Sequence, residues 1–163
     1  MTPMKNLSRS VFPLIALALL VAGAACGPPA DPELVAIAYE RASGGGDPDT
    51  AVNLLDTEQI TSRVEEQIVV VESSGKESFL EDSIETLLWA LFREIRPAEF
   101  AFTATPADID GDTAEVNVTK ISPDGVSTTV VVHLRNTDAG WRVSGASLDR
   151  LVTFAVQRLQ EMY

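Results

Sequence analysis

Hydrophobic and polar positions along the chain change their spacing near residue 99. Before that point apolar residues recur three or four positions apart, which is the period of a helix buried on one face. After it they alternate with polar residues, which is typical of strands in a half-buried sheet. The pattern predicts helices at 32–43, 48–55, 57–71 and 79–95, strands near 100–104, 114–118, 130–134 and 141–143, and a last helix at 147–162.

Capping residues mark the ends of several of these helices. Asp47 stands before the second helix, and Asp56 with Gln59 has the spacing of a capping box before the third. Ser78 begins a second such box in front of the fourth. The three glycines at 44–46 end the first helix, because glycine is a poor helix former.

Short turn signals separate the predicted strands. Asp110-Gly111, Asp124-Gly125 and the stretch 136–140 are typical of hairpin turns. Consecutive strands joined by hairpins form an antiparallel meander, and the alternation gives it one buried face. The predicted fold class is therefore α+β, with N-terminal helices packed on a four-stranded antiparallel curved meander and an additional C-terminal helix.

The N-terminus has the parts of a secretory signal. Lys5 and Arg9 precede fifteen uncharged residues at 11–25, and small residues end the run before Cys26. The run is shorter than the about 20 residues that a membrane-spanning helix needs. We therefore predict a signal peptide at 1–25, a lipidated cysteine and tether at 26–32, and one domain at 33–163.

The residues before Cys26 resemble the lipobox of bacterial lipoproteins, in which the cysteine is acylated. Gly23 stands where that family usually has leucine, and an ordinary signal peptidase could also cleave after Ala22-Gly23-Ala24. Lipidation accounts for the presence and place of the only cysteine. It predicts a protein of the cell envelope, anchored on the periplasmic face and, in a Gram-negative host, at the outer membrane.

Charge limits the partners of the exported part. All 24 acidic residues but only 10 of the 12 basic ones follow residue 25, which leaves a net charge of −14 there. Nucleic acid and anionic head groups would be repelled. The expected partners are the membrane, through the lipid, and either an unidentified protein or an apolar small molecule.

The order of the elements resembles the nuclear transport factor 2-like, or cystatin-like, superfamily over about residues 31–146. The resemblance rests on the helices that precede a meander, the turn at 109–116 and the closing strand at 140–144. A helix after the last strand, together with Gly145-Ala146-Ser147-Leu148, is more weakly similar to periplasmic phospholipid-carrier proteins. That second resemblance implies a ligand cavity between the sheet and the helices.

Candidate ligand-binding residues are those expected where the apolar face of the sheet meets the stripe at 80–95. They are Phe100, Phe102, Val116, Val130, Val132 and Trp141 on the sheet and Leu88 on the stripe. If this junction holds a cavity, its ligand is apolar, such as a lipid. If side chains fill it, the domain acts through its surface. We expect a non-enzymatic binding or interaction module in both cases.

Catalytic alternatives have few residues to use. The only histidine, His133, is expected on the polar face of a strand. A solvent-exposed residue of the sheet is a simpler interpretation of it than a general base. Ketosteroid isomerase-like enzymes of the superfamily imply a tyrosine beside carboxylates, and Tyr39 is the positional match. We therefore predict no catalytic residues, with a lyase or isomerase as the alternative.

Asp108, Asp110 and Asp112 alternate around Gly111 and raise the possibility of calcium binding. An EF-hand loop needs its glycine at the sixth position and a glutamate at the twelfth, and neither is present here. A hairpin turn accounts for the same residues. We therefore expect no metal site and no cofactor, and a calcium-dependent interaction is a further alternative.

Overall fold

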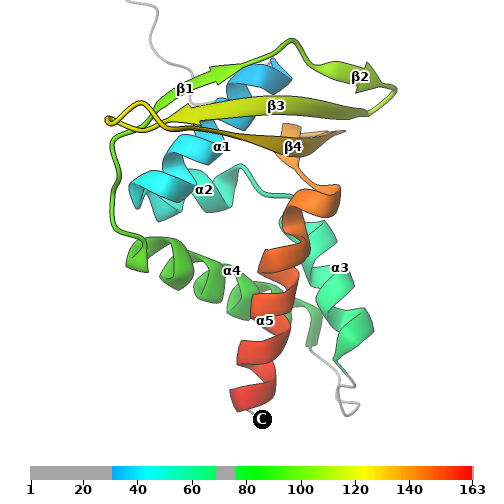
Figure 1. Ribbon diagram of the computed structural model, residues 1–163. Helices are drawn as coiled ribbons and strands as arrows, with labels where there is room; N and C mark the ends of the chain where they lie inside the picture. Colours follow the sequence, from blue (N-terminus) through cyan, green and yellow to red (C-terminus); the bar gives the residue numbers. More distant parts are fainter. Residues whose placement is uncertain (1–30, 69–75, 163) are drawn as a thin grey trace, which may run out of the picture.

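The computed structural model describes residues 31–68 and 76–162 (Figure 1). The helices are α1 Pro32–Gly45, α2 Pro48–Asn53, α3 Thr57–Gln67, α4 Lys76–Glu94 and α5 Asp149–Met162, with a 3₁₀ turn at Gly145–Leu148. The strands are β1 Ala101–Ala104, β2 Asp108–Asp110, β3 Thr113–Ile121, β4 Ser127–Thr137 and β5 Gly140–Val143. The predicted signal peptide, the lipidated cysteine and nearly all of the tether lie outside the described residues.

The sheet is the predicted antiparallel meander, with strand order β1-β3-β4-β5. A short strand, β2, was not predicted and lies in line with β1 along the same side of β3. Ala104 pairs with Val118 and Asp108 pairs with Glu115, so three residues of this edge stand opposite two of β3. The extra residue makes a β-bulge at 105–107. One of these three residues is Pro106, which has no N–H for the ladder.

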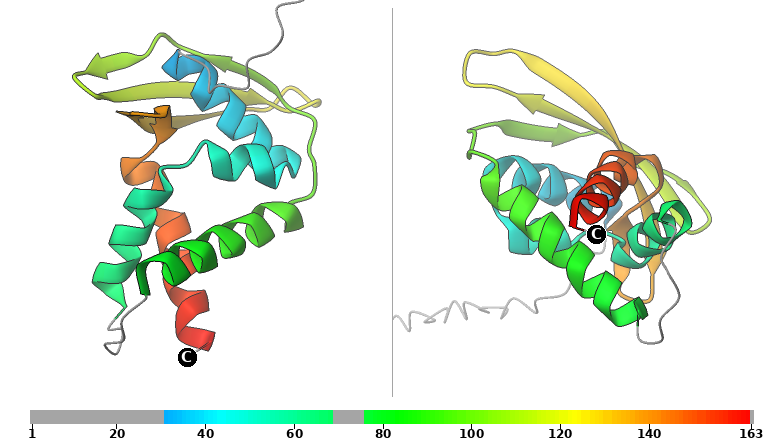
Figure 2. Two further views of the ribbon diagram at one scale, coloured as in Figure 1. Left: turned by 180° about the vertical axis from the view of Figure 1, so that it is seen from behind. Right: turned by 90° about the horizontal axis from the view of Figure 1, so that it is seen from below.

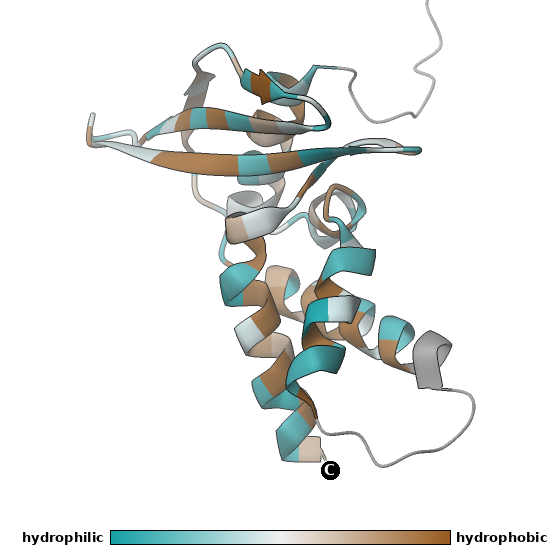
Figure 3. Cartoon of the chain, turned by 90° about the vertical axis from the view of Figure 1, so that its right-hand side faces the viewer, coloured by the Kyte–Doolittle hydropathy of each residue, from teal (hydrophilic) through white to brown (hydrophobic). Residues whose placement is uncertain are grey.

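One face of the sheet is apolar and buried, as the alternation predicts. Hydrophobic and hydrophilic residues follow one another along the strands in Figure 3. The buried face is built from cross-strand pairs of β3 and β4, namely Ala114 with Leu134, Val116 with Val132 and Val118 with Val130. The other face carries the side chains between them.

Helix α1 lies directly under the buried face and contacts β1, β3, β4 and β5. Helix α4 is farther from the sheet and packs mainly against α2, with further contacts to α3 and α5 (Figures 1 and 2). We expected the apolar stripe at 80–95 to pack against the sheet, and this expectation is wrong. Its burial was expected correctly, but α1 and α2 lie between it and the strands.

A single hydrophobic core joins these layers. All of its buried members lie between Val35 and Leu159, and they come from all five helices and from β3, β4 and β5. Within residues 31–68 and 76–162 this core is continuous, and residues 28–163 are expected to fold without the leader. Among residues 31–68 and 76–162, no helix is both long and apolar enough to cross a membrane.

Two predicted helix caps are present. Thr50 N donates to Asp47 Oδ1 at 3.1 Å, and Gln59 N donates to Asp56 Oδ1 at 3.1 Å. The reciprocal half of the capping box at Asp56 is replaced, because Gln59 Oε1 accepts the N–H of Gly145 at 2.7 Å. A side chain predicted to complete a local cap is thus used to hold a distant loop.

Other boundaries differ from the prediction by a few residues. Helix α4 begins at Lys76, so that Ser78 lies inside the helix and does not precede it. Helix α2 ends at Asn53, since Leu55 forms a parallel bridge with Val143. The predicted last turn of the third helix, at 69–71, lies outside the described residues.

The sheet is joined to α3 and α5 at the edge of β5. Val143 N donates to Leu54 O at 2.8 Å, and Asp56 N donates to Val143 O at 2.9 Å. Arg63 on α3 donates to Gly145 O at 3.0 Å, directly after β5. These bonds hold the start of α3 against the chain that leads into α5.

Candidate functional site

The predicted ligand-binding residues fall into two groups by accessibility. Leu88, Val116, Val132 and Trp141 are buried, while Phe102 and Val130 are half-buried and Phe100 is exposed. Leu88 also belongs to a different layer, because its helix packs on α2. The structure therefore does not bring all seven residues to one junction.

The buried group forms closed core. Leu88 and Val116 have no exposed surface, and Val132 retains only 1%. A side chain that lined a cavity wide enough for water would retain reachable surface, so these three do not line one. The sequence leaves open either a cavity or a filled core at this junction. These three side chains belong to a filled core.

Two members of the accessible group, Phe100 and Phe102, lie where β1 begins, and Val130 lies on β4, across β3 from the end of β1. We call these three residues the open end of the sheet. The two phenyl rings meet edge to face with centroids 6.3 Å apart. The Arg41 guanidinium of α1 lies over the Phe102 ring, 5.7 Å from its centroid, which is cation–π distance.

A charged pair borders the open end. Lys120 is the cross-strand partner of Phe102, and its Nζ lies 2.5 Å from Glu40 Oε2 on α1. Both side chains are largely buried, with 28% of Lys120 and 12% of Glu40 exposed. Burying such charges is costly unless they are paired, and here each neutralises the other. The open end thus combines apolar rings with the cations Arg41 and Lys120.

Sequence reasoning did not identify Glu40, Arg41 or Lys120. One signal was present for Lys120, which continues the inward alternation of Val116 and Val118 on β3. A lysine in an inward position requires a partner. Nothing in the sequence marks Glu40 as that partner, because the two residues are 80 positions apart.

Tyr39 is buried on α1 and packs edge to face against Phe92 of α4, with ring centroids 6.4 Å apart. Burial, and secondarily the charge of Glu40, raises the pKa of the Tyr39 hydroxyl far above its ordinary value of 10.0. The hydroxyl therefore stays protonated. The next residue, Glu40, is held by Lys120, so this arrangement does not reproduce the tyrosine-and-acid site of the isomerase alternative.

The other candidate residues lie on or near the outer face of the sheet. His133 Nδ1 lies 3.3 Å from Glu115 Oε1, on the polar side predicted for it. Asp108 and Asp110 are exposed on β2, and Asp112 is exposed in the following turn. Within the described residues, no group of three or more acidic, histidine or cysteine side chains is arranged to hold a metal ion.

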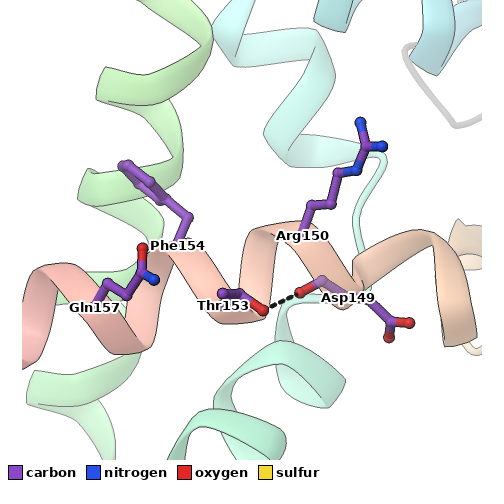
Figure 4. A pocket seen from close by; sticks show the side chains of 5 residues that line it. All are labelled: Asp149, Arg150, Thr153, Phe154 and Gln157. Atoms are coloured by element: carbon purple, nitrogen blue, oxygen red, sulfur yellow. Dashed lines mark hydrogen bonds between the residues drawn. The ribbon is translucent and has the colours of Figure 1, made fainter.

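Two shallow hollows lie on the helices, away from the open end. One, of about 380 Å³, is lined by Asp82, Glu85, Thr86 and Trp89 of α4. The other, of about 280 Å³, is lined by Asp149, Arg150, Thr153, Phe154 and Gln157 of α5. Figure 4 shows the α5 hollow, with Phe154 and Arg150 on the same side of the helix. Both hollows are open surface features lined by a single helix.

No protein-family model matches the chain, and no curated protein matches it in sequence. A phospholipid-binding protein from Ralstonia solanacearum, solved with a bound phospholipid, is 14% identical with a TM-score of 0.52, over 80% of this chain and 87% of that one. A protein named as an NTF2-like transpeptidase from Campylobacter jejuni is 17% identical with a TM-score of 0.45, over 69% and 95%.

A protein named as an aromatic ring hydroxylase from Novosphingobium aromaticivorans is 20% identical with a TM-score of 0.28, over 67% of this chain and 78% of that one. At such identities the likeness concerns the fold alone. The predicted α+β architecture, with helices on an antiparallel meander and a C-terminal helix, is confirmed, and the fold is similar to that of the Ralstonia protein.

Proposed function

We propose that this chain is a lipid-anchored module of the cell envelope that binds an apolar ligand, such as a lipid, without catalysing a reaction. The observation that carries the proposal is the open end, where Phe100, Phe102 and Val130 leave apolar surface accessible at the margin of the buried sheet face. The fold is also similar to that of a protein solved with a phospholipid.

The accessibility of the candidate residues supports the open end as the proposed place of binding. Val116 and Val132 are covered by α1, so a ligand reaches them only if that helix moves. The open end is reached without any movement. Its two rings offer flat apolar surface, and Arg41 is an exposed cation beside them. An amphiphile would place its acyl chain on the rings and its polar head near Arg41.

The test is native purification of residues 28–163 from a bacterial periplasm, followed by organic extraction and mass spectrometry of the extract. We expect a stoichiometric lipid in the wild-type extract. Phe100→Ser should lower its amount several-fold, because Phe100 is exposed and belongs to the open end. Ile109→Ser is the matched control, since Ile109 is 55% exposed on β2, at the other end of the same edge.

An empty wild-type extract would be followed by titration with a fluorescent fatty acid. Absence of saturable binding there would contradict the proposal. Equal lipid content in the Phe100→Ser and Ile109→Ser variants would place binding away from the open end and contradict the proposed site.

The anchor requires a separate test on the full chain. Cys26→Ala removes the acyl acceptor, and two or more acyl chains are what hold a lipoprotein stably on a bilayer. We expect the wild-type protein to remain in the membrane fraction after a carbonate wash and the variant to be released. A variant that stays in the membrane would contradict lipid anchoring at Cys26.

A further inference from the structure

The outer face of the sheet, opposite α1, has an uncharged region that we call the neutral face. It spans the ends of β1, β3 and β4 nearest the β3–β4 turn. Its side chains are Ala101, Thr103, Thr105, Asn117, Thr119, Ile121, Ser127, Thr129 and Val131. All are exposed except Thr119, and Val131 has 48% of its surface exposed.

The absence of charge on the neutral face contrasts with the rest of the chain. The full chain has a net charge of −12, with 22% charged residues. The nine neutral side chains are mostly threonine and aliphatic residues, which suit cross-strand packing. Two of them, Thr119 and Thr129, are joined Oγ to Oγ at 2.9 Å, which orders the centre of the face.

Charged side chains of opposite sign lie beyond one end of the neutral face, the end away from the β3–β4 turn. Farther along the strands, the outer face carries acids on β2 and β3 and bases on β4 and β5. The acids are Asp108, Asp110 and Glu115, and the basic side chains are Arg142 and Arg135, the second of which is also paired with Asp56. His133 lies beside Glu115, with its Nδ1 3.3 Å from Glu115 Oε1. Acids thus lie toward one edge of the sheet and bases toward the other.

We propose that the neutral face is a contact between two copies of this chain, related by a two-fold axis that runs along the strands between β3 and β4. This axis places β3 of one copy over β4 of the other. Thr119 then meets Thr129 of the second copy, and Asn117 meets Val131. The acidic side of each copy lies over the basic side of the other, so the face is complementary to itself.

The size of the face sets the strength of the contact. The nine neutral side chains and the six residues beyond them are fewer than the 20–30 residues a side of a stable complex. We therefore expect a weak dimer, with a Kd of about 0.1–1 mM. The proposal uses the face opposite the open end and does not depend on the proposed ligand.

The test is sedimentation of residues 28–163 over a concentration series up to about 1 mM, with amide chemical shifts followed on dilution. We expect concentration-dependent dimers and shifts centred on β3 and β4, with smaller shifts on the neighbouring strands. Val131→Glu should raise the Kd at least about tenfold, because it places a charge against the uncharged partner face. Val126→Glu makes the same change at a turn residue that is 60% exposed, and it should leave the Kd unchanged.

Three outcomes would overturn the proposal. The first is a wild-type protein that remains a monomer at about 1 mM. The second is a dimer whose Kd is the same in Val131→Glu as in the wild type, since that dimer uses another surface. The third is dilution shifts centred on α4 or α5. Circular dichroism of each variant separates loss of association from loss of fold.

Discussion

At the scale of single residues, Asp56 links three parts of the molecule. Its Oδ1 caps α3 through Gln59 N, and its Oδ2 accepts Nε and Nη2 of Arg135 on β4 at 2.8 and 2.6 Å. Its own N–H donates to Val143 O at the edge of the sheet. Only 4% of Asp56 is exposed, so these partners replace water almost completely.

Asp56→Ala should lower the free energy of unfolding by about 2–4 kcal/mol, because it removes a helix cap and leaves Arg135 without its carboxylate. Asp56→Asn should cost less, since its side-chain oxygen can still cap α3. Urea denaturation of residues 28–163 measures both. A decrease in the free energy of unfolding below about 0.5 kcal/mol in Asp56→Ala would show that this carboxylate does not stabilise the contact between α3 and the sheet.

Glu33 gives the stability a predictable pH dependence. The N–H of Ala107, in the bulge between β1 and β2, donates to Glu33 Oε1 at 2.7 Å. This bond holds the pKa of Glu33 below its ordinary value of 4.5. The folded state therefore binds the proton less readily than the unfolded state, and the stabilisation is present above pH 4.5 and lost as the pH falls through the folded pKa.

Wild type and Glu33→Gln should accordingly differ most in stability above about pH 5 and converge toward pH 3. Urea midpoints at several pH values test this, with Glu58→Gln as the control on another helix. A difference that stays constant over this range would mean that the bond to Ala107 does not favour the ionised carboxylate.

At the scale of elements, the end of α1 depends on one of its three glycines. Gly46 adopts the left-handed conformation, with φ of 70°, and its N–H donates to Ala42 O. A Cβ at Gly46 would lie 2.9 Å from Ile95 O, where the chain leaves α4. Gly44, inside α1, has open space around it.

Gly46→Ala should therefore destabilise the protein by at least about 1–2 kcal/mol, through the unfavourable φ and the contact with Ile95 O. Gly44→Ala should stabilise it by about 0.4–1 kcal/mol, because alanine restricts the unfolded chain and favours the helix. Thermal unfolding distinguishes the two. Equal effects at both positions would contradict the assigned end of α1.

At the scale of the whole molecule, one continuous core connects the sheet to helices α3, α4 and α5. Leu88 is fully buried in it although α4 lies far from the strands. Leu88→Ala should cost about 2–5 kcal/mol, the range for a large cavity in a closed core. Leu34→Ala is the control, since Leu34 is 52% exposed on α1 and its change should stay within about 0.5 kcal/mol.

A cost of less than about 1 kcal/mol for Leu88→Ala, measured by urea denaturation, would indicate that the core around Leu88 is loose. Such a core could admit a ligand without much loss of stability. It would reopen the possibility of a cavity under α1 and α2.

The sequence by itself determined the kinds of element, their order and their buried faces. Helical and strand periods are local properties, so the meander, the C-terminal helix and the caps at Asp47 and Asp56 could be predicted from residues a few positions apart. The inward positions of Val116 and Val132 followed from the same alternation.

Only the tertiary structure decided what each buried face packs against. A period shows that the stripe of α4 is buried, but not that α1 lies between it and the sheet. The same holds for the Glu40–Lys120 pair, for Gln59 binding Gly145 and for which of the seven candidate residues remain accessible. These contacts join residues about 80 positions apart, and their geometry exists only once the layers have assembled.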